Sequence, residues 1–192
     1  MLLTSLNAIA VLDANVLYPV PIRDLLLSLA NEGLFQPKWS SIIQEEWVRN
    51  LLLKRPDLSR NKLLKTVDAM NETFPEANIT GFEDIINGLI LPDNNDRHIV
   101  ATAIRSKSEL IVTFNTKDFP KKYLDNFGID ILHPDIFISD LIHLDHVKAM
   151  NGFNKQVKRL VNPPRSHSQV LDTFENCGLV NSASILREMQ GI

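Results

Sequence analysis

Two short apolar runs constrain the fold of this 192-residue chain more than any other feature. Residues 9–12 and 110–113 are rich in β-branched side chains and are too short to be typical helices. Apolar runs of this length predict strands buried on both faces, as in parallel sheets covered by helices. Helical patterns with short connections follow each run, so we expect βαβ units. The predicted fold class is α/β, with a central parallel sheet flanked by helices.

The remaining pattern divides the chain near residue 139. Before this position, weaker strands are expected at residues 34–37, 79–82 and 128–132, and helices at residues 21–31, 41–53 and 59–74 and from Asp93 onward. After it no strand signal remains, and helices are expected at residues 144–161, 166–177 and 182–189. We therefore predict a core domain at residues 1–138 and a helical C-terminal region at residues 139–192.

Composition sets the broad class of the protein. The chain is 44% hydrophobic and 22% charged with a net charge of −3, which argues against a strongly basic nucleic-acid coat. Cys177 is the single cysteine, so no intrachain disulfide is possible and a reducing compartment is expected. No apolar run approaches the roughly 18 residues of a membrane span. A signal peptide begins with a positively charged segment, but no lysine or arginine precedes Arg23 here. We predict a cytoplasmic protein that does not enter a membrane.

Residues 91–103 combine a helix start with two carboxylates. Asp93 is a good N-cap, Asp96 follows at the spacing of a capping box, and apolar residues then recur at helical spacing. A cap uses one aspartate at most, and a second carboxylate beside an apolar stripe is costly unless it meets a cation. Asp96 is therefore a candidate cation ligand, while Asp93 is either a further ligand or only the helix cap.

Polar side chains follow both of the predicted core strands. Asp13 and Asn15 come directly after the first strand, and Thr113, Asn115 and Asp118 lie at the end of the second. Open α/β sheets bind ligands at the carboxyl ends of their strands, so we expect these side chains to meet there. The alternative for Asp13 is a local role in turning the chain or capping the next helix.

One further acid is expected to reach this edge of the sheet. Glu45 and Glu46 are adjacent on the predicted helix at residues 41–53 and point about 100° apart. Glu45 is set to pair with Arg49 on the solvent face, whereas Glu46 lies at the edge of the buried stripe. Glu46 is the better candidate for a cleft, although the alternative of an ordinary surface acid holds for both.

The chemistry of these side chains points to a hard metal ion. Oxygen ligands without cysteine or histidine suit Mg²⁺ or Mn²⁺, which can orient a phosphodiester, activate water and neutralise the leaving oxygen. No P-loop or Rossmann glycine pattern is present, and His143 and His146 lack the framework of a zinc site. A basic cluster is either a solvated helix face or a nucleic-acid contact: Lys54, Arg55, Arg60, Lys62 and Lys65.

The order of these residues resembles the PIN domain family. Residues 11–19 read Val-Leu-Asp-Ala-Asn-Val-Leu-Tyr-Pro, and residues 112–120 read Val-Thr-Phe-Asn-Thr-Lys-Asp-Phe-Pro. Glu46 on the second predicted helix and Asp96 at the start of a later one complete the pattern. These motifs are similar to those of bacterial VapC-like proteins, the toxin components of toxin–antitoxin pairs, and the similarity spans roughly residues 8–138.

The resemblance implies a PIN-like three-layer fold and a Mg²⁺- or Mn²⁺-dependent endoribonuclease that acts on RNA. It also implies a homodimer and inhibition by a small antitoxin protein. Asn115 stands where many members carry a fourth aspartate, and Asp118 is displaced from that position. The site expected from the motif positions comprises Asp13, Glu46, Asp96 and Asp118 as catalytic residues, with Asp13, Glu46, Asp93 and Asp96 as metal ligands and Asn15, Thr113 and Asn115 as supporting residues.

Other functions fit parts of the same pattern. Asn115 in place of an aspartate is consistent with a catalytically weak PIN-like module that binds RNA or a partner. A DNA-directed, structure-specific nuclease would use similar acids, although the basic charge here is modest. A phosphotransfer or phosphatase fold usually needs a second aspartate where Asn15 stands, and it would leave Glu46 without a role.

Overall fold

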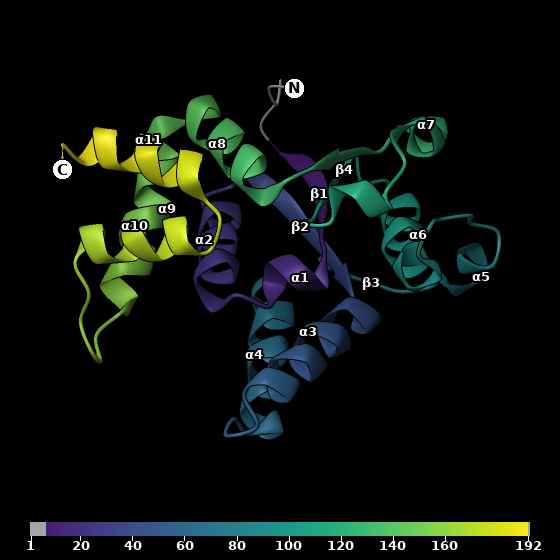
Figure 1. The fold of residues 1–192 in the computed structure, drawn as a ribbon, viewed down its shortest axis with the longest axis horizontal. Helices are drawn as coiled ribbons and strands as arrows, with labels where there is room; N and C mark the ends of the chain where they lie inside the picture. Colours follow the sequence, from purple (N-terminus) through teal and green to yellow (C-terminus); the bar gives the residue numbers. More distant parts are fainter. Residues whose placement is uncertain (1–6, 192) are drawn as a thin grey trace. The chain divides into compact units, whose positions relative to one another are not determined.

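The computed structural model describes residues 7–191 of the chain (Figure 1). Contacts between residues divide this part of the chain into two compact units. One, here called the sheet unit, comprises residues 9–18 and 37–132. The other, here called the helical unit, comprises residues 7–8, 19–36 and 133–191 among those described.

Most of a five-stranded parallel sheet lies in the sheet unit, with the strand order β3-β2-β1-β4-β5. In this sheet Leu12 is in register with Val112, and Val112 with Leu132. The two strands predicted from the apolar runs are therefore neighbours whose carboxyl ends share one edge. The predicted α/β class with a central parallel sheet and flanking helices is confirmed. The strands are β1 (Ala8–Leu12), β2 (Phe35–Ser40), β3 (Asn78–Ile79), β4 (Leu110–Val112) and β5 (Asp130–Leu132).

The helices of the sheet unit include two long ones, α3 and α4, which lie side by side (Figure 1). The Ser40 hydroxyl caps α3 by accepting a hydrogen bond from the Ile43 backbone N–H at 3.4 Å. The predicted apolar stripe of α3, which includes Trp47, is buried. The helices are α1 (Ala14–Leu17), α3 (Ser41–Lys54), α4 (Arg60–Thr73), α5 (Glu83–Ile86), α6 (Arg97–Ser106) and α7 (Lys121–Leu124), with 3₁₀ turns at Asn94–Asp96, Thr116–Asp118 and Asp125–Phe127.

The predicted boundaries of two weaker strands are wrong. Strand β2 continues through Pro37 to Ser40 because the backbone N–H of Trp39 donates to the Ala77 carbonyl at 2.9 Å and extends the pairing. Strand β3 begins at Asn78 and is only two residues long. Gly81 follows with a φ of +70°, a left-handed conformation that ends the strand before residue 82.

The helical unit contains α2 (Val20–Asn31), α8 (Pro134–Leu144), α9 (His146–Arg159), α10 (His167–Asn176) and α11 (Val180–Gln190). The helix expected at residues 144–161 begins later because Asp145 leaves the helical conformation and caps α9, its Oδ1 accepting from the Lys148 N–H at 3.0 Å. In the core of the helical unit, Phe153 and Phe174 pack with their ring centroids 5.9 Å apart. None of the helices within residues 7–191 has the length and apolarity needed to cross a membrane.

Asp135, in the first turn of α8, accepts hydrogen bonds from the start of α11. It is 5% exposed, and its Oδ1 accepts from the Ser182 backbone N–H at 2.8 Å and from the Ser182 hydroxyl at 2.7 Å. Its Oδ2 accepts from both the backbone N–H and the side-chain amide of Asn181, each at 2.9 Å. Leu179, the N-cap residue of α11, provides no side-chain cap. Asp135 therefore supplies the acceptors that the first turn of α11 lacks.

We expect Asp135→Ala to lower the free energy of unfolding of the helical unit by about 3 kcal/mol, because it removes the acceptor of the buried Ser182 donors and of the Asn181 donors. Thermal unfolding followed by circular dichroism measures the change. Asp172→Ala is the matched control, since Asp172 is exposed and only pairs with Arg187 across the surface. Equal melting temperatures for the two variants would contradict this role of Asp135.

Candidate active site

Asp13 lies directly after β1 and is 4% exposed. Its backbone N–H donates to the Val112 carbonyl at 3.1 Å, so the pairing of β1 with β4 continues past the strand. Its Oδ2 accepts from Thr113 Oγ1 and from Asn15 Nδ2, both at 2.6 Å. The side chain makes no capping hydrogen bond to α1. The structure thus brings Asn15 and Thr113, which follow different core strands, together around the Asp13 carboxylate.

Asn15 and Thr113 also hold each other. Asn15 Nδ2 donates to Thr113 Oγ1 at 2.9 Å, and Asn15 Oδ1 accepts from the Phe114 N–H at 3.1 Å. The Asn115 backbone N–H donates to Thr113 Oγ1 at 3.0 Å. The Thr113 hydroxyl oxygen accepts from Asn15 and from Asn115, so the hydroxyl proton is left to donate to Asp13. This network fixes the orientation of the buried carboxylate.

We expect Thr113→Val to lower the free energy of unfolding by about 1–2 kcal/mol, because it keeps the shape of the side chain but removes the hydroxyl. It should also raise the pKa of Asp13 further, since the Thr113 hydrogen bond lowers that pKa. Thermal unfolding and an NMR titration of the Asp13 carboxyl measure the two effects. Thr66→Val, which removes a hydroxyl from α4, is the control. An unchanged Asp13 pKa in Thr113→Val would contradict the assignment.

Asp93 and Asp96 have different roles in the turn that precedes α6. Asp93 caps the 3₁₀ turn, with its Oδ1 accepting from the Asn95 N–H at 2.8 Å. Asp96 occupies the position before α6, but its side chain makes no capping hydrogen bond. Asp96 therefore does not act as a side-chain cap of α6. The Asp96 carboxylate is left available for other contacts.

Glu46 projects from α3 toward His98 in the first turn of α6. The distance from Glu46 Oε2 to His98 Nε2 is 3.4 Å, and the two side chains are 32% and 11% exposed. His98 was not among the site residues predicted from the sequence. A signal was present, because His98 lies only two residues after Asp96, at the same start of α6.

Glu45 is held by a different partner from the one expected. Its carboxylate forms two hydrogen bonds with the Arg60 guanidinium of α4, at 2.8 and 3.2 Å. The predicted pair between Glu45 and Arg49 is wrong, because α4 lies beside α3 and offers a bidentate partner.

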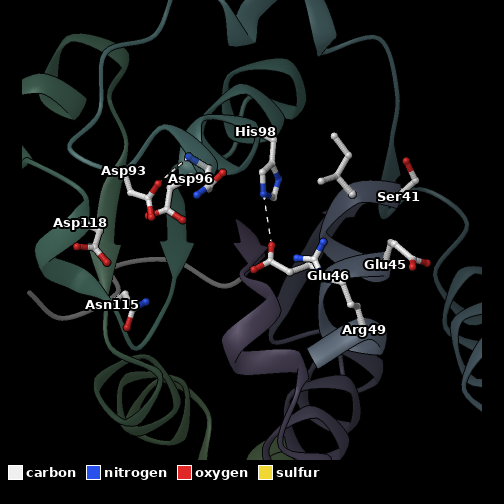
Figure 2. Close-up of a pocket in the computed structure, with 11 residues that line it drawn as sticks. Ser41, Glu45, Glu46, Arg49, Asp93, Asp96, His98, Asn115 and Asp118 are labelled. Carbon is white, nitrogen blue, oxygen red and sulfur yellow. Dashed lines mark hydrogen bonds and ion pairs between the residues drawn. The ribbon is translucent and has the colours of Figure 1, made fainter. Parts of the chain in front are cut away.

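A cavity of about 740 Å³ lies between the turn before α6, the start of α3 and the loop after β4. Figure 2 shows Glu46 and His98 facing its centre, with Asp93, Asp96, Asn115 and Asp118 toward one side and Arg49 toward the other. Asp13 is not among its lining residues, but it acts electrostatically on Asp96. The lining residues are Ser41, Ile42, Glu45, Glu46, Arg49, Asp93, Asn95, Asp96, His98, Asn115 and Asp118.

Burial and mutual repulsion raise the pKa of two carboxyls at this cavity. Burial raises the pKa of Asp13 to about 6, opposed by the Thr113 hydrogen bond and assisted by the charge of Glu46. Burial raises the pKa of Asp96 to about 7, and the charges of Asp13, Asp93, Asp118 and Glu46 add to the effect. The acids are therefore close enough to repel one another.

The donor set fits a hard cation in chemistry and in charge. Carboxylate and amide oxygens dominate the cavity, and their repulsion is of the kind that a divalent ion relieves. Within residues 7–191, however, no three side chains of Asp, Glu, His or Cys are close enough to share an ion as they are arranged. The acids are gathered at one edge of the sheet but are not assembled around a metal position.

Comparison with known proteins agrees with this geometry. Residues 10–117 match the PIN domain family, and residues 134–188 match the family described as the VapC50 C-terminal domain. The chain is 36% identical over 103 residues to the protein named "Putative ribonuclease VapC50" of Mycobacterium tuberculosis. That alignment covers 52% of this chain and 61% of the relative. No solved structure matches the chain. Since the PIN match covers more than half of its residues, this chain belongs to the PIN domain family.

Proposed function

We propose that this protein is a divalent-metal-dependent endoribonuclease that hydrolyses phosphodiester bonds of RNA. The observation that carries the proposal is that Asp13, Glu46 and Asp96 lie close enough to repel one another, and that burial, together with this repulsion, raises the pKa of Asp96 to about 7. Such a cluster of repelling carboxylates is typical of a site that functions with a cation. Membership of the PIN family and the name of the relative support the same reaction.

Asp13, Glu46 and Asp96 would hold a Mg²⁺ or Mn²⁺ ion, with Asp118 and Asp93 at the periphery of the same cavity. When bound, the ion supplies charge stabilisation to the phosphate and lowers the pKa of water. Asn15 and Thr113 fix the Asp13 carboxylate through their hydrogen bonds.

Two further residues would assist from the margins of the cavity. His98 holds the Glu46 carboxylate on its inner side, at 3.4 Å. The exposed amide of Asn115 would contact the substrate or water rather than carry negative charge.

We further propose that the protein is the toxin of a toxin–antitoxin pair, inhibited by a small antitoxin protein and active as a homodimer. The similarity to the VapC50 relative and the match of residues 134–188 support this proposal. We propose, too, that residues 1–138 carry the chemistry and residues 139–192 serve another purpose. None of the acids assigned to the site lies after residue 138.

We expect the purified protein to cut single-stranded RNA with Mg²⁺ or Mn²⁺ and to stop when EDTA is added. Products should carry 5′-phosphate and 3′-hydroxyl ends, because water attacks from outside the RNA. End-group analysis by mass spectrometry measures this. A 2′,3′-cyclic phosphate would show that the ribose hydroxyl attacked instead. Cleavage of DNA alone would favour a structure-specific nuclease, and binding without cleavage would favour a non-catalytic module.

A further inference from the structure

Arg49 is a cation in a cavity otherwise dominated by acids. It lies on α3 one turn after Glu45 and Glu46, is exposed, and lines the cavity with them (Figure 2). Within the described part of the chain, its guanidinium forms no hydrogen bond and no ion pair. Several carboxylates line the same cavity and could pair with this guanidinium, so the absence of an ion pair needs a physical reason.

The reason is the partner that Glu45 has taken. Glu45 and Arg49 are spaced i,i+4 on one helix, the spacing at which a glutamate and a following cation pair most readily. Instead, both oxygens of Glu45 are occupied by Arg60 of α4. The Glu45–Arg60 pair thus leaves Arg49 without its natural helical partner, facing the cavity.

The position of Arg49 suits an anion that extends beyond the acid cluster. Asp93, Asp96, Asn115 and Asp118 lie toward the opposite side of the cavity from Arg49, with Glu46 between them (Figure 2). A small free anion would be repelled by these acids. A strand of linked phosphates can place one phosphate at the acids and a neighbouring phosphate at a guanidinium, which binds phosphate oxygens in a bidentate manner.

We propose that Arg49 binds a backbone phosphate of the RNA strand next to the one that is cut, and that the Glu45–Arg60 pair keeps Arg49 available for it. This inference rests on the proposed ribonuclease function. Ile42, which is 40% exposed, lies two turns before Arg49 on the same helix and lines the same cavity, where it provides an apolar surface for a ribose or base. Arg49 would therefore set substrate affinity, while the acids carry the chemistry.

The test is the binding of a fluorescein-labelled single-stranded RNA, followed by anisotropy over a range of KCl concentrations. All proteins carry Asp96→Asn so that the RNA is not cut. Adding Arg49→Gln should weaken binding roughly tenfold at low salt and reduce the slope of log affinity against log salt by about 0.7, the value for one phosphate contact with a single strand. Arg105→Gln, at the far end of α6, removes the same charge and should change neither quantity.

The Glu45–Arg60 pair gives a second, independent comparison. Arg60→Gln should also weaken RNA binding, because the released Glu45 can then capture Arg49. Adding Glu45→Gln to Arg60→Gln should restore it, since the competing carboxylate is gone. If the double variant binds RNA as weakly as Arg60→Gln, Arg60 itself contacts RNA, and the proposal that the Glu45–Arg60 pair keeps Arg49 available is wrong.

The failure of this inference is distinguishable from failure of the proposed function. If the parent protein cuts the same RNA and Arg49→Gln binds it as tightly as the background, the assignment of Arg49 is overturned while the ribonuclease stands. If the parent neither binds nor cuts RNA, both are overturned. Arg49→Gln should also leave Mn²⁺ affinity within about twofold; a larger loss would show that Arg49 supports Glu46 instead.

Discussion

Asp96→Asn is expected to reduce RNA cleavage by about a thousandfold while leaving the metal-free protein at least as stable as the parent. The substitution keeps the size of the side chain but removes one charge from a cluster of repelling carboxylates. It should also shrink the rise in melting temperature that Mg²⁺ produces, because that rise reflects binding to the native state. Cleavage assays and melting curves with EDTA and with Mg²⁺ measure the three effects.

The pH dependence of the metal-free protein follows from the same carboxyls. Asp96 has a pKa of about 7 and Asp13 about 6 in the folded chain, against 3.8 for an ordinary aspartate. Between about pH 4 and 7 the folded state therefore binds more protons than the unfolded state, and the free energy of unfolding falls as the pH rises. Asp96→Asn should reduce this fall.

Asp68→Asn provides the matched control, since Asp68 is exposed on α4 and does not line the cavity. It should leave cleavage, the Mg²⁺ response and the pH dependence close to those of the parent. An Asp96→Asn protein that melts lower in EDTA, responds fully to Mg²⁺ and still cuts RNA would assign Asp96 to a structural role.

Glu46→Gln is expected to slow cleavage about a hundredfold, whereas Glu45→Gln should stay within about threefold of the parent. Both side chains line the cavity, so exposure alone does not separate them. Their partners do: Glu46 faces His98 and repels Asp13 and Asp96, while Glu45 is bound to Arg60. Single-turnover rates on one RNA decide between them. Equal losses, or a loss confined to Glu45→Gln, would reverse the assignment.

Much of the fold could be predicted because its strongest signals are local. The apolar runs at residues 9–12 and 110–113 predict strands that are buried on both faces. Their pairing as β1 and β4 brings Asp13 and Thr113 together. The helix face of α3 was equally predictable from the spacing of Ile43 and Trp47. The separation of α8 from α9 was harder, since it depends on the capping hydrogen bond of Asp145.

Two side-chain contacts at the cavity that were not predicted join helices far apart in the chain. The sequence places Arg49 four residues after Glu45, at the spacing of a helical ion pair. Only the position of α4 shows that Arg60 binds Glu45 instead. Glu46 and His98 likewise meet because α3 and the start of α6 face the same cavity, which no spacing in the sequence reveals. The division of the chain at residue 138 and the roles of the individual acids stay predictions.

The central claim is that the acids at this sheet edge bind the divalent ion on which RNA cleavage depends. Mn²⁺ binding by electron paramagnetic resonance, measured with cleavage rates in the same titration, tests it most directly. We expect cleavage to rise with bound Mn²⁺ at the same half-saturation, and Asp96→Asn to weaken both together. Cleavage that continues in EDTA, or that persists in Asp96→Asn after Mn²⁺ binding is lost, would contradict the claim.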